Sequence, residues 1–250
     1  MTDSQDALDE KLLLTDAFLA LQDHFQNYEG FHNQYKNIPD TMKIRFLRFA
    51  SVYRNLVKDG NFNVPPEALT KSNDNFYDIT YKYIALISII EAVVADDTWI
   101  DFYQWLRKKA KNKEIKTFPI ENQNELDELY KQYKSEFGAI SSAVKFFKAL
   151  EEREQEFLQK KLGRLKNDQG KFFKTESTIT ELAKLLYDVR SEFVHNAKLI
   201  PAFSDFPSII ANHRSGPFTS SLTLNQLMHI FEIGFMRHFG IRPDHQVLLF

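Results

Sequence analysis

Apolar residues recur every three or four positions along most of the chain, and this is the period of an amphipathic α-helix. No segment sustains the alternation of apolar and polar residues that is typical of a β-strand. The sequence therefore predicts an all-α protein, built as a helical bundle. The expected helices span approximately residues 6–28, 39–58, 77–95, 99–111, 122–136, 139–165, 178–198 and 221–239.

Turn-forming residues divide the chain between the second and third expected helices. The segments Asn63-Val-Pro-Pro66 and Lys71-Ser-Asn-Asp-Asn75 lie there, and such clusters mark loops. The apolar side chains before this division need a partner surface, so the first helices should pack on the rest. We expect an N-terminal helical extension, a linker, a main bundle and a tail over residues 1–60, 61–76, 77–240 and 241–250.

Two sequence patterns predict where later helices begin. Thr178 with Glu181, and Thr223 with Gln226, have the spacing of a capping box, in which the two side chains satisfy backbone N–H groups at a helix start. The Pro-, Ser- and Gly-rich segment 202–220 between these helices is expected to be a loop.

Composition limits the class of protein. The chain has 250 residues and no cysteine, which excludes a disulfide framework, Cys-based zinc sites and thiol catalysis and is typical of a reducing compartment. The acidic N-terminus is unlike a secretory leader. The longest apolar run, residues 83–95, contains Ser88 and Glu91 and is too short to cross a bilayer. We therefore expect a cytoplasmic protein without membrane contact. Its net charge of −2 means that any contact with nucleic acid would be local.

The helix expected over residues 178–198 carries the candidate chemistry. It contains Tyr187-Asp-Val-Arg-Ser-Glu-Phe-Val-His-Asn196, in which Arg190 precedes His195 by five positions. An imidazole can move a proton and a guanidinium can hold charge on a phosphate, so the pair suits phosphodiester chemistry. At 100° per residue, Arg190 lies at the edge of the apolar stripe, and His195 lies about 180° from its centre at Leu186. His195 should therefore point away from the core, with Glu192 also on the polar side.

The pattern Tyr-x-x-Arg-Ser-x-x-Val-His resembles the signature of the HEPN superfamily, over approximately residues 77–240. The resemblance implies a helical bundle that cuts RNA by attack of the ribose 2′-OH, with neither metal nor cofactor. It implies that His195 is the general acid or base and that Arg190 stabilises the phosphate. It also implies a homodimer, in which two copies of His195 share one cleft, and candidate partners that include an antitoxin or another defence-system protein.

The remaining residues of the predicted site leave alternatives open. Ser191 stands where many catalytic members have Asn, Asp or His, so a non-catalytic HEPN module that binds RNA, a nucleotide or a protein partner is the alternative function. Asn196 either contacts a phosphate or ends the helix, and Tyr187 is a supporting residue of the same pattern. Glu91 is the only charge in its apolar run, so it should be paired or functional rather than buried alone. The resemblance makes Arg190 or a backbone N–H its candidate partner, and the alternative is that Glu91 lies at the edge of the apolar face.

A rival interpretation is a di-iron bundle built on two Glu-x-x-His patterns. Such sites need side chains that project inward, which the expected polar positions of Glu192 and His195 disfavour. We therefore predict no metal site, and we interpret the three C-terminal histidines as ordinary helix and tail residues. The residues concerned are Glu29, His32, Glu192 and His195, with Glu91 and Glu232 as further carboxylates, and His229, His238 and His245.

Overall fold

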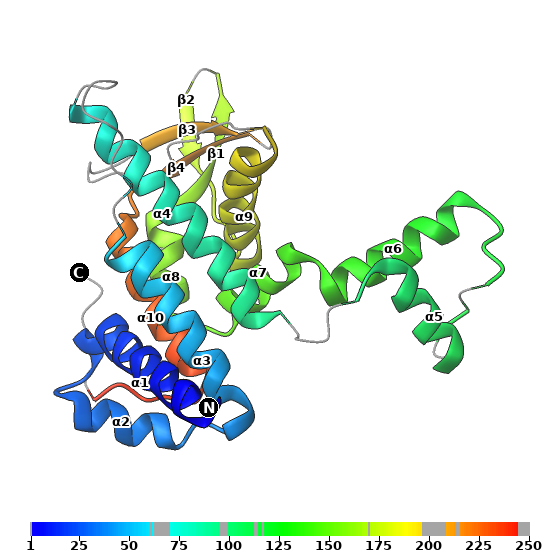
Figure 1. The fold of residues 1–250 in the computed structure, drawn as a ribbon. Helices are drawn as coiled ribbons and strands as arrows, with labels where there is room; N and C mark the ends of the chain where they lie inside the picture. Colours follow the sequence, from blue (N-terminus) through cyan, green and yellow to red (C-terminus); the bar gives the residue numbers. More distant parts are fainter. Residues whose placement is uncertain are drawn as a thin grey trace.

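The computed structural model describes residues 2–60, 62, 71–95, 100–112, 115–116, 118–169, 171–196, 209–213 and 216–244. Over these ranges the protein is mostly helical, with one small antiparallel sheet (Figure 1). The helices are α1 (Thr2–Leu21), η1 (Gln22–His24), α2 (Tyr28–Lys36), α3 (Asp40–Tyr53), η2 (Arg54–Lys58), α4 (Lys71–Val94), α5 (Phe102–Asn112), α6 (Gln123–Phe137), α7 (Ala139–Lys148), α8 (Glu152–Lys161), α9 (Ile179–Asn196) and α10 (Leu224–His238). The strands are β1 (Leu162–Asp168), β2 (Lys171–Lys174), β3 (Ile209–His213) and β4 (Gly216–Ser220).

The main body is a bundle in which α4, α7, α9 and α10 pack together. One core cluster joins Leu86 of α4, Phe147 of α7, Leu186 of α9 and Phe231 of α10, each no more than 1% exposed. The hydroxyl of Tyr83 in α4 also donates to the carbonyl of Leu186. The expected packing of these four segments is confirmed, and burial of such side chains is the main force that holds them together.

The N-terminal helices belong to the same core. Phe46 of α3 stacks on Phe235 of α10 with ring centroids 5.3 Å apart, and Phe31 of α2 is fully buried. The chain after α10 returns to this end of the body (Figure 1), where the N–H of Asp244 donates to the carbonyl of His24 at 3.0 Å. The extension therefore packs on the bundle, as expected, and the described part of the predicted tail packs with it.

The mostly helical fold is as expected, but the structure adds a small sheet that the sequence did not predict. Its strand order is β2-β1-β4-β3, with every neighbouring pair antiparallel. The single helix expected over residues 139–165 is instead α7, α8 and the start of β1. Gly163 disfavours helix there, and pairing with β4 supplies the backbone partners of the strand. Residues 209–213 and 216–220, expected in a loop, form the hairpin of β3 and β4.

Two other expected helices differ from the prediction by more than a few residues. The helix expected over residues 6–28 ends at Leu21, and a new helix starts at Tyr28 because the Asn27 side chain caps it, accepting from the Gly30 N–H at 2.9 Å. The helix expected from residue 77 begins at Lys71, so residues 71–76 of the predicted linker are helical. Apart from Phe62, the earlier part of the linker lies outside the described residues.

Helices α5 and α6 form a hairpin that projects from the body (Figure 1). A small core of its own, formed by Trp105, Leu106 and Leu129, holds the two helices together. Among the described helices, none has both the length and the apolar character that a membrane crossing requires.

Candidate functional site

Helix α9 is positioned by its cap and its apolar stripe. Thr178 and Glu181 form the expected reciprocal contacts, with the Thr178 N–H donating to Glu181 at 2.8 Å and the Glu181 N–H donating to Thr178 Oγ1 at 3.3 Å. Leu182, Leu186 and Val189 are at most 3% exposed. The orientation of the helix about its axis is therefore fixed, with the polar residues of the predicted site at its edge and outer face.

Arg190 lies at the edge of this stripe, as expected, with 18% of its side chain exposed. It donates from Nε and Nη2 to the hydroxyl of Ser88 at 3.3 and 3.2 Å. Its Nη2 lies 3.6 Å from Oε2 of Glu91, so the expected contact of Glu91 with Arg190 is confirmed. The guanidinium also lies over the ring of Tyr187, 6.0 Å from its centroid. Ser88 is the residue of this group that the sequence did not single out.

Glu91 is an unusual carboxyl group. Burial raises the pKa of Glu91, and the charge of Arg190 opposes that rise. Within the described part of the chain, its Oε1 is buried without a hydrogen-bond partner. Burial likewise raises the pKa of Tyr187, and the nearby charge of Glu91 adds to the rise. Arg190 is therefore the group that makes this partly buried position tolerable for a carboxylate.

The end of α9 carries the rest of the predicted site. His195 and Asn196 are exposed, and Ser191 is half-buried. The Asn196 amide donates to Oε2 of Glu192 at 3.2 Å. Glu192 is only 7% exposed, so its expected position on the polar side was wrong. His195 faces solvent, as predicted. It follows Arg190 along α9, whereas the side chain of Arg190 contacts Ser88 and Glu91.

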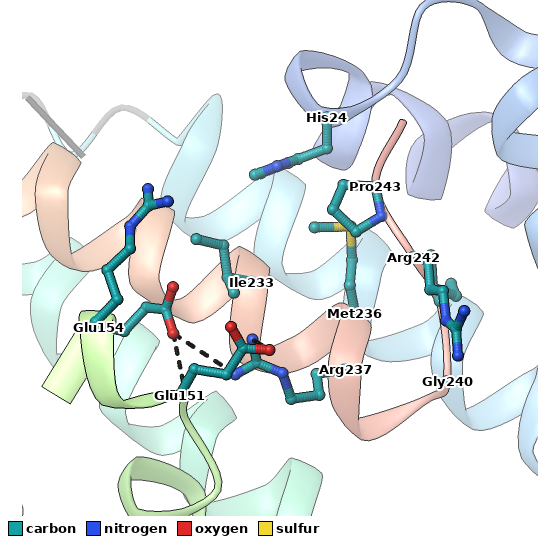
Figure 2. A pocket seen from close by; sticks show the side chains of 11 residues that line it. His24, Glu151, Glu154, Ile233, Met236, Arg237, Gly240, Arg242 and Pro243 are labelled. Carbon is teal, nitrogen blue, oxygen red and sulfur yellow. Dashed lines mark hydrogen bonds and ion pairs between the residues drawn. The ribbon is translucent and has the colours of Figure 1, made fainter. Parts of the chain in front are cut away.

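A separate cavity of about 600 Å³ opens between α8, α10, η1 and the segment after α10 (Figure 2). Its charged wall consists of three arginines, two glutamates and one histidine. Arg237 binds Oε1 of Glu151 at 2.8 Å through Nη2, and its Nη1 lies 3.8 Å from Glu154. The charged lining residues are His24, Glu151, Arg153, Glu154, Arg237 and Arg242, and neither Arg190 nor His195 is among them.

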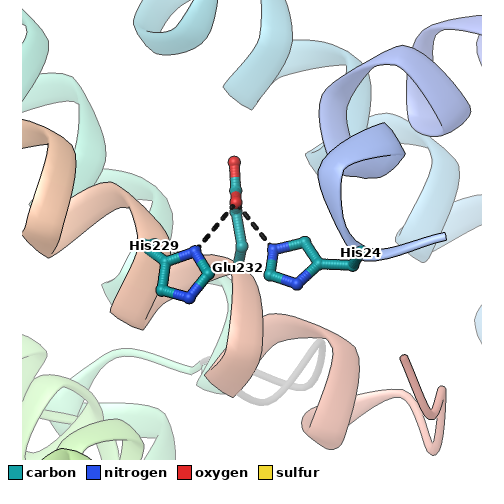
Figure 3. A group of neighbouring side chains, drawn as sticks. All are labelled: His24, His229 and Glu232. Atoms are coloured by element: carbon teal, nitrogen blue, oxygen red, sulfur yellow. Dashed lines mark hydrogen bonds and ion pairs between the residues drawn. The ribbon is translucent and has the colours of Figure 1, made fainter. Parts of the chain in front are cut away.

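Next to this cavity, His24, His229 and Glu232 converge (Figure 3). Nε2 of His24 lies 2.8 Å from Oε2 of Glu232, and Nδ1 of His229 lies 3.8 Å from the same oxygen. Burial alone would raise the pKa of Glu232, but the hydrogen bond from His24, the charge of Lys58 and the hydrogen bond from Tyr53 hold it below its ordinary value. Glu232 is therefore a buried carboxylate rather than a neutral acid.

The sequence reasoning missed this group, although a signal was present. His229-Ile-Phe-Glu232 places an imidazole and a carboxylate one helical turn apart on α10. The sequence prediction of His229 as an ordinary helix residue is therefore wrong, because it considers only the reverse spacing, Glu-x-x-His. His238 instead lines a different cavity, and His245 lies outside the described residues.

The residues of the di-iron alternative are not brought together. Glu29 is exposed, and His32 stacks on Tyr28 with ring centroids 5.6 Å apart. Glu91 pairs with Arg190, whereas Glu232 belongs to the cluster with His24. Across the ranges that the structure describes, one group of three has the side chains to hold a metal ion, and it is His24, His229 and Glu232.

Comparisons of the chain with protein-family models, with curated proteins and with solved structures find no match. The HEPN resemblance therefore rests on the residues of α9 themselves.

Proposed function

We propose that the protein is a metal-independent endoribonuclease of the HEPN type. The observation that carries the proposal is the arrangement on α9. Arg190 is held at the edge of the bundle by Ser88 and Glu91, and the exposed imidazole of His195 follows on the same helix. A fixed guanidinium and an accessible imidazole are the two groups that transesterification at phosphorus requires.

The mechanism assigns one task to each group. The 2′-OH of a ribose attacks the adjacent phosphorus, and the bond to the 5′-oxygen of the next nucleotide breaks. One imidazole takes the proton from the 2′-OH, and a second acid protonates the leaving 5′-oxygen. Arg190 binds the equatorial oxygens, whose charge grows in the transition state, and its planar fork suits two of them at once.

Helix geometry favours a site shared by two copies of the chain. Five residues along an α-helix correspond to about 7.5 Å of rise and about 140° of rotation. Arg190 and His195 of one helix therefore face different directions. A two-fold dimer that brings two α9 ends together supplies two imidazoles and two guanidinium groups to one cleft.

The experiment is incubation of mixed RNA with the protein in EDTA, with circular dichroism to verify that the chain stays folded. We expect cleavage that leaves 2′,3′-cyclic phosphate ends and is lost in His195→Ala. Arg190→Lys should retain binding but lose most of the rate, because lysine keeps the charge without the fork. His32→Ala, which changes a half-buried histidine on α2, is the matched control and should cleave like the wild type.

A non-catalytic module is the second candidate, and the contacts of Arg190 favour it. The guanidinium already has partners in Ser88 and Glu91, and the chain carries a net charge of −2. In this case α9 would bind RNA, a nucleotide or a protein partner, such as an antitoxin or another component of a defence system. RNA that every form of the protein binds but leaves intact would decide for this module and against the enzyme.

A further inference from the structure

The side chains of His24, His229 and Glu232 present one ligand atom each to a common point (Figure 3). These atoms all lie within 4.8 Å of one another. Ligand atoms around a tetrahedral ion with bonds of about 2.1 Å are about 3.4 Å apart. The observed distances of 2.8 Å and 3.8 Å to Oε2 of Glu232 lie on either side of that value. Rotations of the side chains that close the wider separations, of up to 4.8 Å, would complete three positions of a coordination sphere.

The carboxylate is oriented for this role by its other oxygen. Oε1 of Glu232 accepts from the hydroxyl of Tyr53 at 2.7 Å and from Nζ of Lys58 at 3.2 Å. These contacts leave Oε2 facing the two imidazoles. A carboxylate that binds a metal through one oxygen is commonly fixed by hydrogen bonds to the other. The cluster thus has both the ligands and the supporting contacts of a built site.

The charge of Lys58 does not prevent a cation from binding. Lys58 also contacts Oδ2 of Asp23 at 2.8 Å, so one ammonium is shared by two carboxylates. With neutral imidazoles, the cluster and its surroundings contain two carboxylates and one ammonium, and therefore carry a net negative charge. The carboxylates are Glu232 and Asp23, and the ammonium is Lys58. A bound cation would therefore be attracted to this position rather than repelled.

We propose that His24, His229 and Glu232 bind a divalent transition-metal ion. Two imidazole nitrogens with one carboxylate oxygen favour ions such as zinc, nickel or iron(II) over magnesium or calcium, which prefer oxygen ligands. His24 belongs to η1, whereas His229 and Glu232 belong to α10. The ion would therefore cross-link the N-terminal extension to the bundle. His24 also lines the cavity of about 600 Å³ (Figure 2), which gives the ion and a water ligand a route from solvent.

The test uses the untagged full chain, stripped of metal with EDTA and dialysed into buffer. Titration with zinc chloride in a calorimeter should show one ion per chain, and saturation should raise the midpoint of thermal unfolding. Cobalt(II) should give the intense visible absorption of a tetrahedral site. His24→Gln and His229→Gln should each weaken binding at least about 100-fold, since each removes one ligand. His32→Gln is the matched control on α2 and should bind like the wild type.

Two results would overturn the proposal. One is the absence of stoichiometric zinc binding by the wild-type chain. The other is binding that His24→Gln and His229→Gln leave unchanged, because the ion would then lie elsewhere. Both glutamine variants keep a hydrogen-bonding side chain of similar size, and circular dichroism of the stripped proteins verifies that loss of binding is not loss of folding.

Discussion

Replacing Glu232 by Gln tests how strongly the buried charge of α10 holds the N-terminal extension. Glu232 is 4% exposed and, besides His229 on its own helix, it has three hydrogen-bond partners, His24 at 2.8 Å, Tyr53 at 2.7 Å and Lys58 at 3.2 Å. All three partners precede residue 60, and Glu232 lies in the last helix. The amide of Gln has the same shape but no charge, so the variant changes the electrostatics of this contact with little change in packing.

The expected loss follows from the contacts. Removing one partner of a buried ion pair costs about 3–5 kcal/mol, because the remaining charge is left desolvated. Lys58 retains Asp23 as a partner, and the Gln carbonyl can still accept from Tyr53. We therefore expect Glu232→Gln to lower the free energy of unfolding by about 3 kcal/mol. For a chain of this size, that loss corresponds to a fall of about 6–12 °C in Tm.

The assay is urea and thermal unfolding at neutral pH in EDTA, so that no bound metal contributes. Tyr53→Phe should cost less, about 1.5 kcal/mol, because it removes one hydrogen bond and leaves the carboxylate paired. Glu128→Gln is the control, since its ion pair with Lys131 is exposed and should contribute almost nothing. A stability of Glu232→Gln equal to that of the wild type would refute the reasoning that this charge network holds the extension in place.

Three further predictions concern the core, the carboxyl group beside Arg190 and the assembly. Gly234→Ala should destabilise the protein by about 1–3 kcal/mol in the same unfolding assay, because overpacking strains the core. The Cβ of the new alanine would lie 2.6 Å from the Phe146 ring. Unchanged stability would show that the ring can move aside. Burial raises the pKa of Glu91 in the folded state, so its contribution to stability is present below the ordinary carboxyl pKa and is lost as pH rises through the folded pKa. Glu91→Gln should therefore lose less stability than the wild type as the pH rises above about 4.5. Free energies of unfolding that change with pH in the same way for both proteins would contradict this prediction. The chain should sediment as a dimer of two 29.3 kDa subunits, and a fully active monomer would exclude the shared RNA-cleavage site.

Helices with long periodic patterns could be predicted from the sequence, whereas the sheet could not. The Thr178–Glu181 and Thr223–Gln226 capping boxes work through local contacts, and both form as expected. The strands are short, and β1 pairs with β4 across more than 40 intervening residues. Such pairing depends on tertiary context, which a window of sequence does not contain.

The candidate sites show the same division between local and distant information. Glu91 stands out as the only charge in the apolar run of its helix, so a partner for it could be expected, and Arg190 was one of the candidates that the resemblance offered. His24 and Glu232 lie 208 positions apart, and only the packing of η1 against α10 brings them together. Two of the three cluster members, His229 and Glu232, could be recognised in the sequence as a one-turn pair, but the third, His24, required the fold.

The proposed metal site and the proposed RNA-cleavage site can fail independently, because they lie on different helices and depend on different chemistry. Zinc binding that is lost in His229→Gln, together with intact RNA, would establish the cross-link between η1 and α10 and leave α9 as a binding surface. Cleavage in EDTA without zinc binding would establish the enzyme. It would also show that the cluster of His24, His229 and Glu232 is a buried hydrogen-bond network and not a metal site. If both hold, the metal should act on activity only through stability. Stripped and zinc-loaded protein should then cleave RNA at the same rate well below the midpoint of unfolding and diverge only as the temperature approaches it.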